Sequence, residues 1–282
     1  MQIETINLNL PESRIGKFTI KKKLLRKGTY CDIINKREAL YTGQKSKSKI
    51  LEKDLIIDVL SETDYGTWMT TSPQEIRQMR EDIKNISGKV LIGGLGLGVV
   101  AKLLDEKPEV TDILIVEQSQ EIIDLVFDNL NLKKASVTKY DLFSYLERIP
   151  LSFDYGYYDI WCPTGEDVLF THIRPLRKLS KKRIKKEVIC WQEKTMIGQM
   201  IFNIFSTLEV SDEKSGWKIL NDEQFKRSYN FSRTTWPFQN WYRTIKPDIE
   251  FAKIMAKNYV NTYVDIDEWN NQWKKWDYET KN

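Results

Sequence analysis

Between residues 89 and 191 the hydrophobic positions follow two alternating patterns. Short, nearly continuous apolar runs bounded by turn residues predict buried strands, and the apolar positions between them recur at spacings of three and four, which predicts helices. Strands that are buried on both faces and joined by helices form a doubly wound, mostly parallel sheet. The pattern therefore predicts an α/β fold, with strands at residues 89–93, 111–116, 135–140, 157–162 and 187–191 and helices at 99–104, 122–130 and 167–179.

The segments on either side of this core have different patterns. The first seventy residues carry β-branched and aromatic residues between Gly and charged breaks, which predicts a small antiparallel sheet with strands near 17–24, 30–34, 39–41 and 55–60. Beyond Thr195 a long amphipathic helix leads into an aromatic-rich region. We expect three parts: a β-rich N-terminal domain at 1–71, a Rossmann-like core at 72–205, and a helical, aromatic-rich C-terminal extension at 206–282 that packs on the core.

The sequence predicts that a helix begins at the start of the core. Ser72 is a capping residue, Pro73 stands at the first helical position, and Glu75 follows three residues after the cap. Apolar residues then recur at spacings of three and four as far as Ile86, and Ser87-Gly88 is expected to end the helix.

The composition is that of a soluble globular protein, with 282 residues of which 41% are hydrophobic and 30% charged. No apolar run reaches the roughly 18 residues that a membrane span needs, and the first residues lack a secretory pattern, so we expect a cytoplasmic protein without membrane contact. The chain has 3 cysteines, far apart, and 1 histidine, so neither a disulfide framework nor a metal site is expected. The net charge of +4 is compatible with a nucleic-acid partner but does not indicate one.

The strand at 89–93 ends in a glycine-rich turn that opens into a helix. Gly94, Gly96 and Gly98 permit positive φ and let backbone N–H groups approach a ligand closely. Dinucleotide-binding turns have the spacing Gly-x-Gly-x-x-Gly, whereas here Val99 stands where the third glycine would fall. The spacing therefore disfavours a nicotinamide or flavin dinucleotide.

Acidic residues follow the next two strands of the predicted sheet. In this class of sheet the ligand lies at the carboxyl ends of the strands. Glu117 follows the second strand, about twenty residues after the glycines, where a carboxylate is placed to accept both hydroxyls of a ribose. Asp141 follows the third strand, where it is placed to accept from the exocyclic amine of an adenine.

Together these features resemble the class I S-adenosylmethionine-dependent methyltransferase superfamily over residues 72–205. Within it, Ile92-Gly93-Gly94 through Gly98-Val99-Val100 resembles the first motif of the spermidine synthase-like branch, which also has a small β-domain before the core. The resemblance implies S-adenosylmethionine as cofactor, or its decarboxylated form if the chain is an aminopropyltransferase. The residues expected to bind it are Gly93, Gly94, Leu95, Gly96, Gly98, Glu117, Gln118, Tyr140, Asp141, Leu142 and Trp161.

Two departures from that branch concern the chemistry. The branch has an aspartate in its glycine motif where this chain has Gly96, and its aminopropyltransferases carry an Asp-rich motif after the fourth strand. This chain has Trp161-Cys162-Pro163-Thr164 there, so no carboxylate is expected at the end of the fourth strand. Methyl transfer is therefore favoured over aminopropyl transfer.

The catalytic residues are not evident from the pattern. Trp161 forms either a wall for a flat substrate or a cover for the adenine, and Glu166 and Asp167 are either substrate ligands or the first turn of the next helix. The methyl acceptor, a small molecule or a nucleic acid, is undecided, and a homodimer is left open.

Two further features leave alternatives open. The basic run from Arg174 to Lys186 is either a solvated helix face or a phosphate-tracking patch beside the site. The tryptophans at 269, 273 and 276 are either a packing face or a stacking platform. A non-catalytic module, in which these two features bind a partner on a methyltransferase scaffold, is the alternative to an enzyme.

Overall fold

The computed structural model describes residues 3–34, 46–162 and 168–206. These fall into two compact units. The first holds residues 3–33, 48–162 and 175–191, and the second holds residue 34 together with 46–47, 168–174 and 192–206. The aromatic C-terminal extension lies outside the described residues, as do Glu166, Asp167 and the strand expected at 39–41. None of the helices in the described ranges combines the length and apolar character needed to cross a membrane.

The N-terminal part of the first unit is an antiparallel sheet, as the sequence predicts. Its strand order is β1-β2-β5-β6, and β3 and β4 form a separate two-stranded sheet. The bounds are β1 (Ser13–Ile15), β2 (Phe18–Leu25), β3 (Tyr30–Ile34), β4 (Lys47–Ile50), β5 (Leu55–Glu62) and β6 (Gly66–Thr70).

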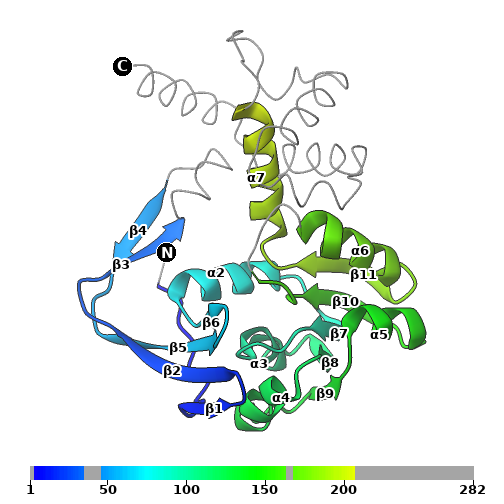
Figure 1. Cartoon of the computed structure of the whole chain (residues 1–282), viewed down its shortest axis with the longest axis horizontal. Coiled ribbons are helices and arrows are strands. Elements are labelled where there is room, and N and C mark those ends of the chain that lie inside the picture. The colour runs from blue at the N-terminus through cyan, green and yellow to red at the C-terminus, as the bar shows by residue number, and fades with distance from the viewer. Residues whose placement is uncertain (1–2, 35–45, 163–167, 207–282) are drawn as a thin grey trace. The chain divides into compact units, whose positions relative to one another are not determined.

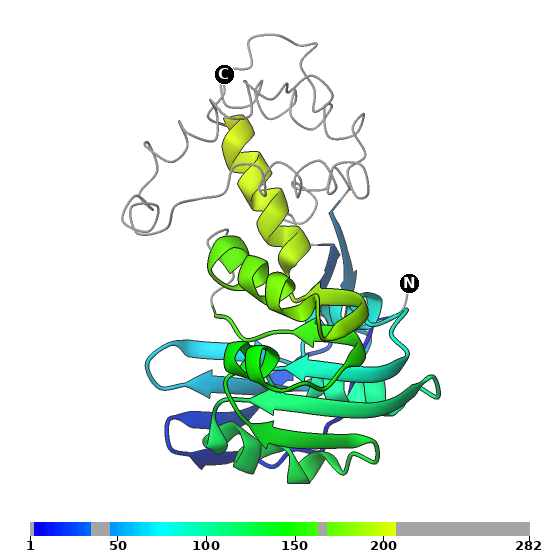
Figure 2. The same ribbon diagram turned by 90° about the vertical axis from the view of Figure 1, so that its right-hand side faces the viewer.

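The central sheet of the first unit is parallel throughout and has the order β11-β10-β7-β8-β9 (Figures 1 and 2). Its strands are β7 (Gly88–Gly93), β8 (Val110–Glu117), β9 (Ala135–Lys139), β10 (Phe153–Tyr158) and β11 (Ile184–Cys190). The chain moves outward from β7 to β9 and then returns to β10 on the other side of β7. This reversal confirms the doubly wound, Rossmann-like fold, and it places the switch in strand order between β7 and β10.

The helices follow from the same connections. Right-handed crossovers put α3 and α4 on one face of the sheet and α5 and α6 on the other, and in Figure 2 the side with α5 and α6 faces the viewer. The bounds are α2 (Pro73–Asp82), α3 (Val99–Asp105), α4 (Gln120–Val126), η1 (Asp128–Leu130), α5 (Leu142–Arg148), η2 (Leu169–Ile173), α6 (Arg174–Ser180) and α7 (Glu193–Ser206).

The predicted start of α2 is confirmed and its predicted end is wrong. Ser72 is the N-cap, and its hydroxyl accepts the Glu75 N–H. The helix ends at Asp82, several residues before Ser87. Ile83 and Ile86 are still buried, in the turn that follows, where the Lys107 ammonium donates to the Ile83 carbonyl at 2.9 Å. The apolar spacing indicated burial correctly but continued beyond the helix.

Two strands begin earlier than the sequence suggests. The fourth strand is expected at 157–162, whereas β10 begins at Phe153 and ends at Tyr158. The fifth is expected at 187–191, whereas β11 begins at Ile184. Apolar residues resume at Ile160 and Trp161 beyond the end of β10, so the pattern does not mark the end of the strand. The pairing of Tyr158 with Gly93 fixes it. Helix α5 was not predicted, although Leu142, Tyr145 and Leu146 are all buried at helical spacing.

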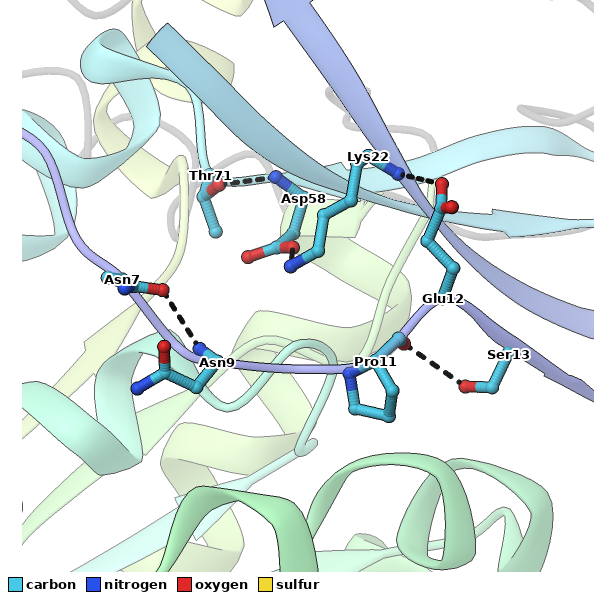
Figure 3. Close-up of polar contacts among 8 residues, drawn as sticks. All are labelled: Asn7, Asn9, Pro11, Glu12, Ser13, Lys22, Asp58 and Thr71. Atoms are coloured by element: carbon cyan, nitrogen blue, oxygen red, sulfur yellow. Dashed lines mark hydrogen bonds and ion pairs between the residues drawn. The ribbon is translucent and has the colours of Figure 1, made fainter.

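A partly buried ion pair joins two strands of the N-terminal sheet (Figure 3). Asp58 on β5 is 4% exposed and pairs with the ammonium of Lys22, its cross-strand neighbour on β2. The Asp58 N–H also donates to the Thr71 hydroxyl at 2.7 Å. The pair lies within the sheet that reaches the glycine turn, so its loss is expected to weaken that sheet.

We expect Asp58→Ala to lower the free energy of unfolding by about 1–3 kcal/mol, because Lys22 loses the carboxylate that it meets in a buried setting. Urea unfolding followed by circular dichroism measures it. Asp112→Ala is the control, since the pair of Asp112 with Lys89 spans 4.0 Å between exposed side chains and should contribute little. Equal losses of unfolding free energy in the two variants would show that the Asp58–Lys22 pair stabilises the fold no more than an exposed pair does.

Candidate functional site

The glycine turn after β7 has three residues at positive φ, namely Gly94 at +90°, Gly96 at +52° and Gly98 at +73°. Gly94 is required for space as well, because a Cβ there would stand 2.1 Å from the carbonyl oxygen of Asp159. A Cβ on Gly98 would stand 2.2 Å from Leu130 Cδ1, so this glycine allows the start of α3 to pack closely. The turn therefore lies tightly between the end of β10 and the α4–η1 segment.

Glu117 at the end of β8 anchors this turn. Its Oε2 accepts the Leu95 N–H at 2.8 Å, and its Oε1 accepts the Ser119 N–H, also at 2.8 Å. Both carboxylate oxygens thus hold backbone groups, one in the glycine turn and one in the turn after β8. The structure places Glu117 next to the turn, as the sequence predicts, and adds a structural role that the sequence did not show.

Most backbone N–H groups of the turn are already paired. The Gly94 N–H donates to the Val116 carbonyl at 2.9 Å, and the Gly98 N–H donates to the Leu95 carbonyl at 2.7 Å. The Leu97 N–H donates to the sulfur of Met69 at 3.3 Å. Gly94 and Gly96 are partly exposed whereas Leu95 and Leu97 are buried, so the two glycines form the surface that a ligand would meet.

The residues after β9 lie at the same edge of the sheet. Asp141 is the N-cap of α5, where its Oδ1 accepts the Ser144 N–H at 2.8 Å. Its other carboxylate oxygen is not used by this cap. The Leu142 side chain lies against Gly93, since a Cβ on Gly93 would stand 2.3 Å from Leu142 Cδ2. Tyr140, just before Asp141, is half-buried and packs edge-on against Tyr145.

The remaining predicted residues are less closely grouped. Trp161 follows β10 and is 6% exposed, so it is a packed side chain. Gln118 is exposed beside Glu117. Gly96, where the resemblance implies an aspartate, is partly exposed and has Met69 beside it, whose sulfur would lie 2.8 Å from a Cβ at that position.

Asp159 is the functional candidate that the sequence analysis missed. It follows the last residue of β10, and its backbone N–H donates to the Gly93 carbonyl at 2.8 Å. The expectation that the fourth strand ends without a carboxylate is therefore wrong. The alternation of apolar residues with Asp154 and Gly156 was a signal that the strand begins before Tyr157, but only the pairing of Tyr158 with Gly93 puts Asp159 at the strand end.

The environment of Asp159 favours its neutral form. Burial raises the pKa of Asp159 to about 8, and the negative charges of Glu75, Asp82 and Glu117 act in the same direction. Within the described part of the chain, no hydrogen bond or ion pair reaches the Asp159 carboxyl. A carboxyl group that titrates near neutral pH at the carboxyl edge of such a sheet is a candidate general base.

Glu75 brings a second acidic group to this region from the N-terminus of α2. Its carboxylate accepts from the Thr70 N–H at 3.1 Å and from the hydroxyls of Thr70 and Ser72. Burial raises the pKa of Glu75, and these hydrogen bonds oppose that effect. The capping box therefore holds in place an acidic group whose negative charge raises the pKa of Asp159.

The later part of the basic run, from Lys178 to Lys186, does not lie beside this site. Lys185 and Lys186 are exposed at the start of β11, and Lys178 is exposed on α6 just before that strand. They lie at the amino edge of the sheet. The length of β11, about 20 Å, separates this edge from the carboxyl edge where the glycine turn lies. Arg183 turns inward instead and donates to the Leu146 carbonyl at 3.1 Å. A phosphate-tracking patch next to the glycine turn is therefore excluded for these residues.

The sequence matches no protein-family model, and no curated protein sequence matches it. Several solved structures are similar at low identity. Precorrin 8w decarboxylase of Methanobacterium thermoautotrophicum is 16% identical, with a TM-score of 0.32 over 43% of this chain and 62% of that chain. A dimethyladenosine transferase from Plasmodium falciparum is 16% identical, with a TM-score of 0.34 over 46% of this chain and 45% of that chain.

The ribosomal protein L11 methylase from Lactobacillus delbrueckii subsp. bulgaricus is 19% identical, with a TM-score of 0.30 over 42% of this chain and 57% of that chain. The chain thus spans less than two thirds of the length of each of these three proteins. Because the similarities are this low, the function of the site is inferred from its own residues.

Proposed function

We propose that this protein is an S-adenosylmethionine-dependent methyltransferase whose cofactor lies over the glycine turn at the carboxyl edge of the central sheet. One observation carries the proposal: the turn at Gly94–Gly98, Glu117 at the end of β8 and Asp141 after β9 stand at successive strand ends of one parallel sheet. This is the place where such folds bind nucleotide ligands. The turn itself, with Val99 where a dinucleotide motif has glycine, favours this cofactor.

Each predicted cofactor residue has a role in this proposal. Gly94 and Gly96 present the open surface of the turn to the methionine part of the cofactor. The lone pairs of Glu117 that its two backbone hydrogen bonds leave free would accept from the ribose hydroxyls. The free oxygen of Asp141 would accept from the adenine amine, and Leu142 would contact the ring. Trp161, buried after β10, would close the site above Asp159.

Asp159 is proposed to remove a proton from the acceptor. Methyl transfer needs the nucleophile, the methyl group and the sulfonium in line, and a neutral nucleophile must also lose a proton. The backbone carbonyl of Asp159 lies against Gly94, so this residue adjoins the part of the turn where the reacting methyl group would lie. A base whose pKa is near 8 is well matched to that task at neutral pH. The acceptor is therefore expected to carry a removable proton.

Aminopropyl transfer from decarboxylated S-adenosylmethionine is the second candidate, and Asp159 is the observation that favours it. The sequence argued against this reaction because no carboxylate was expected at the fourth strand. A carboxyl group there, with a pKa near 8, could take the proton of an amine that attacks decarboxylated S-adenosylmethionine, as aminopropyl transfer requires. The resemblance to the spermidine synthase-like branch also supports this second candidate.

Calorimetry distinguishes these candidates. Titration with S-adenosylmethionine, S-adenosylhomocysteine and decarboxylated S-adenosylmethionine should give saturable binding of the first two if the protein transfers methyl groups. Tighter binding of the decarboxylated form would favour aminopropyl transfer. A folded protein that binds none of the three would reject the proposal and favour a non-catalytic module.

Glu117→Ala should weaken the binding of S-adenosylhomocysteine by about 1.5–3 kcal/mol, because charge-assisted hydrogen bonds to the ribose are lost. Glu121→Ala, in the first turn of α4, is the matched control and should bind S-adenosylhomocysteine normally. Because Glu117 also holds the Leu95 N–H, the ribose contact is isolated with a 2′-deoxy analogue of the ligand. If the deletion of that hydroxyl costs the variant as much affinity as it costs the wild type, Glu117 does not contact the ribose.

A further inference from the structure

The N-terminal sheet contributes one side chain to the glycine turn. Met69 lies on β6 and is buried, and its sulfur accepts the Leu97 N–H at 3.3 Å. The same sulfur would lie 2.8 Å from a Cβ on Gly96. The thioether therefore touches two consecutive residues of the turn, far from them in the sequence.

Both backbone conformation and space favour the glycine at position 96. A φ of +52° lies in the left-handed region, which asparagine and aspartate also adopt. A side chain at this position would, however, collide with the Met69 sulfur. Met69 thus fills the volume that a side chain on residue 96 would take in another chain of this fold.

Met69 is held in place from two sides. It pairs with Leu60 of β5 in the sheet, and the next residue, Thr70, donates both its N–H and its hydroxyl to Glu75 at the start of α2. A sulfur that is fixed at the junction of β6 and α2 can restrain the turn without moving itself. It also gives the buried Leu97 N–H a partner that a hydrocarbon side chain could not supply.

We infer that Met69 is a positioning residue of the glycine turn, so that the affinity of the turn for an adenosine cofactor depends on a side chain of the N-terminal sheet. The inference rests on the proposed function, because the ligand of the turn is the cofactor proposed above. Methionine is suited to this role because its flexible, polarizable thioether fills an irregular gap and accepts a weak hydrogen bond.

The first test is Met69→Leu, which keeps most of the volume and removes the acceptor. We expect it to weaken the binding of S-adenosylhomocysteine by about three- to tenfold, with a small loss in Tm. Met79→Leu on α2 is the control, since Met79 is also a buried methionine but is not the one whose sulfur accepts the Leu97 N–H. If Met69→Leu binds as tightly as the wild type, the inference is wrong.

A second measurement does not depend on the cofactor. Amide hydrogen exchange, read in a ¹H–¹⁵N spectrum, should be faster at Leu97 in Met69→Leu than in the wild type, and unchanged there in Met79→Leu. If the wild type binds no adenosine ligand, the proposed function fails while this result still decides the positioning role. Unchanged protection of the Leu97 amide would overturn it.

A double-mutant cycle tests the shared space. Gly96→Ala should lower the Tm of the wild-type chain, partly through collision with the sulfur. In a Met69→Ala background that collision is gone, so the same substitution should cost less. Additive losses in Tm would show that the two residues do not share this space.

Discussion

Asp159→Asn is expected to remove most of the transfer activity while the protein still binds S-adenosylhomocysteine. The substitution keeps the size of the side chain and removes its ability to take a proton, and the loss of a general base typically costs about 10²–10⁴ in rate. Single-turnover assays with a proton-bearing acceptor measure the rate, and calorimetry measures the binding. A variant that transfers at the wild-type rate would show that Asp159 is not the base.

The pH dependence gives a sharper test of the same role. With the pKa of Asp159 raised to about 8, kcat/KM in the wild type should rise about tenfold per pH unit below that value and level off above it. Asp154→Asn is the matched control, because Asp154 lies at the other end of β10, where its carboxylate accepts the Lys89 N–H at 2.9 Å. The control should keep the wild-type profile.

The same group links stability to pH. Because the folded state holds the Asp159 proton more tightly than the unfolded state, where the carboxyl has an ordinary pKa near 3.9, its contribution to stability is complete at acid pH. That contribution is lost as the pH rises toward about 8. Unfolding at pH 5 and pH 9 should therefore differ less in Asp159→Asn than in the wild type.

The sequence predicted the parts of this site that local patterns encode. The Ser72–Glu75 capping box, the glycine turn and the acidic residue after the second strand all lie where local spacing placed them, because strand–turn–helix units carry their own signals. The role of Glu117 in holding the turn was less accessible, since it depends on how β8 pairs with β7.

Asp159 and Met69 could not be found in the same way. Apolar residues continue at Ile160 and Trp161 past the end of β10, and only the pairing of Tyr158 with Gly93 shows that Asp159 leaves the strand there. Met69 reaches Leu97 across 28 residues, between a strand of one sheet and a turn of another. Contacts at that separation depend on the packing of the two sheets, for which the sequence carries no periodic signal.

The close approach of β10 to the glycine turn predicts that Gly94→Ala disrupts both the fold and the site. An alanine at a φ of +90° is strained by about 1–2 kcal/mol. Its Cβ would also stand 2.1 Å from the Asp159 carbonyl oxygen, a backbone atom that cannot turn aside as a flexible side chain can. Together these effects should lower the free energy of unfolding by more than about 3 kcal/mol.

Gly28→Ala separates the two causes. Gly28 has the same φ of +90°, and a Cβ there would meet nothing within 4 Å, so this variant should show the backbone strain alone. Urea unfolding of both variants then gives the cost of the collision as the difference between them. Because relief of the collision must displace either the turn or the Asp159 backbone, any Gly94→Ala protein that folds should also lose affinity for S-adenosylhomocysteine. Equal destabilisation in the two variants, with normal binding in Gly94→Ala, would mean that β10 and the turn are not in close contact.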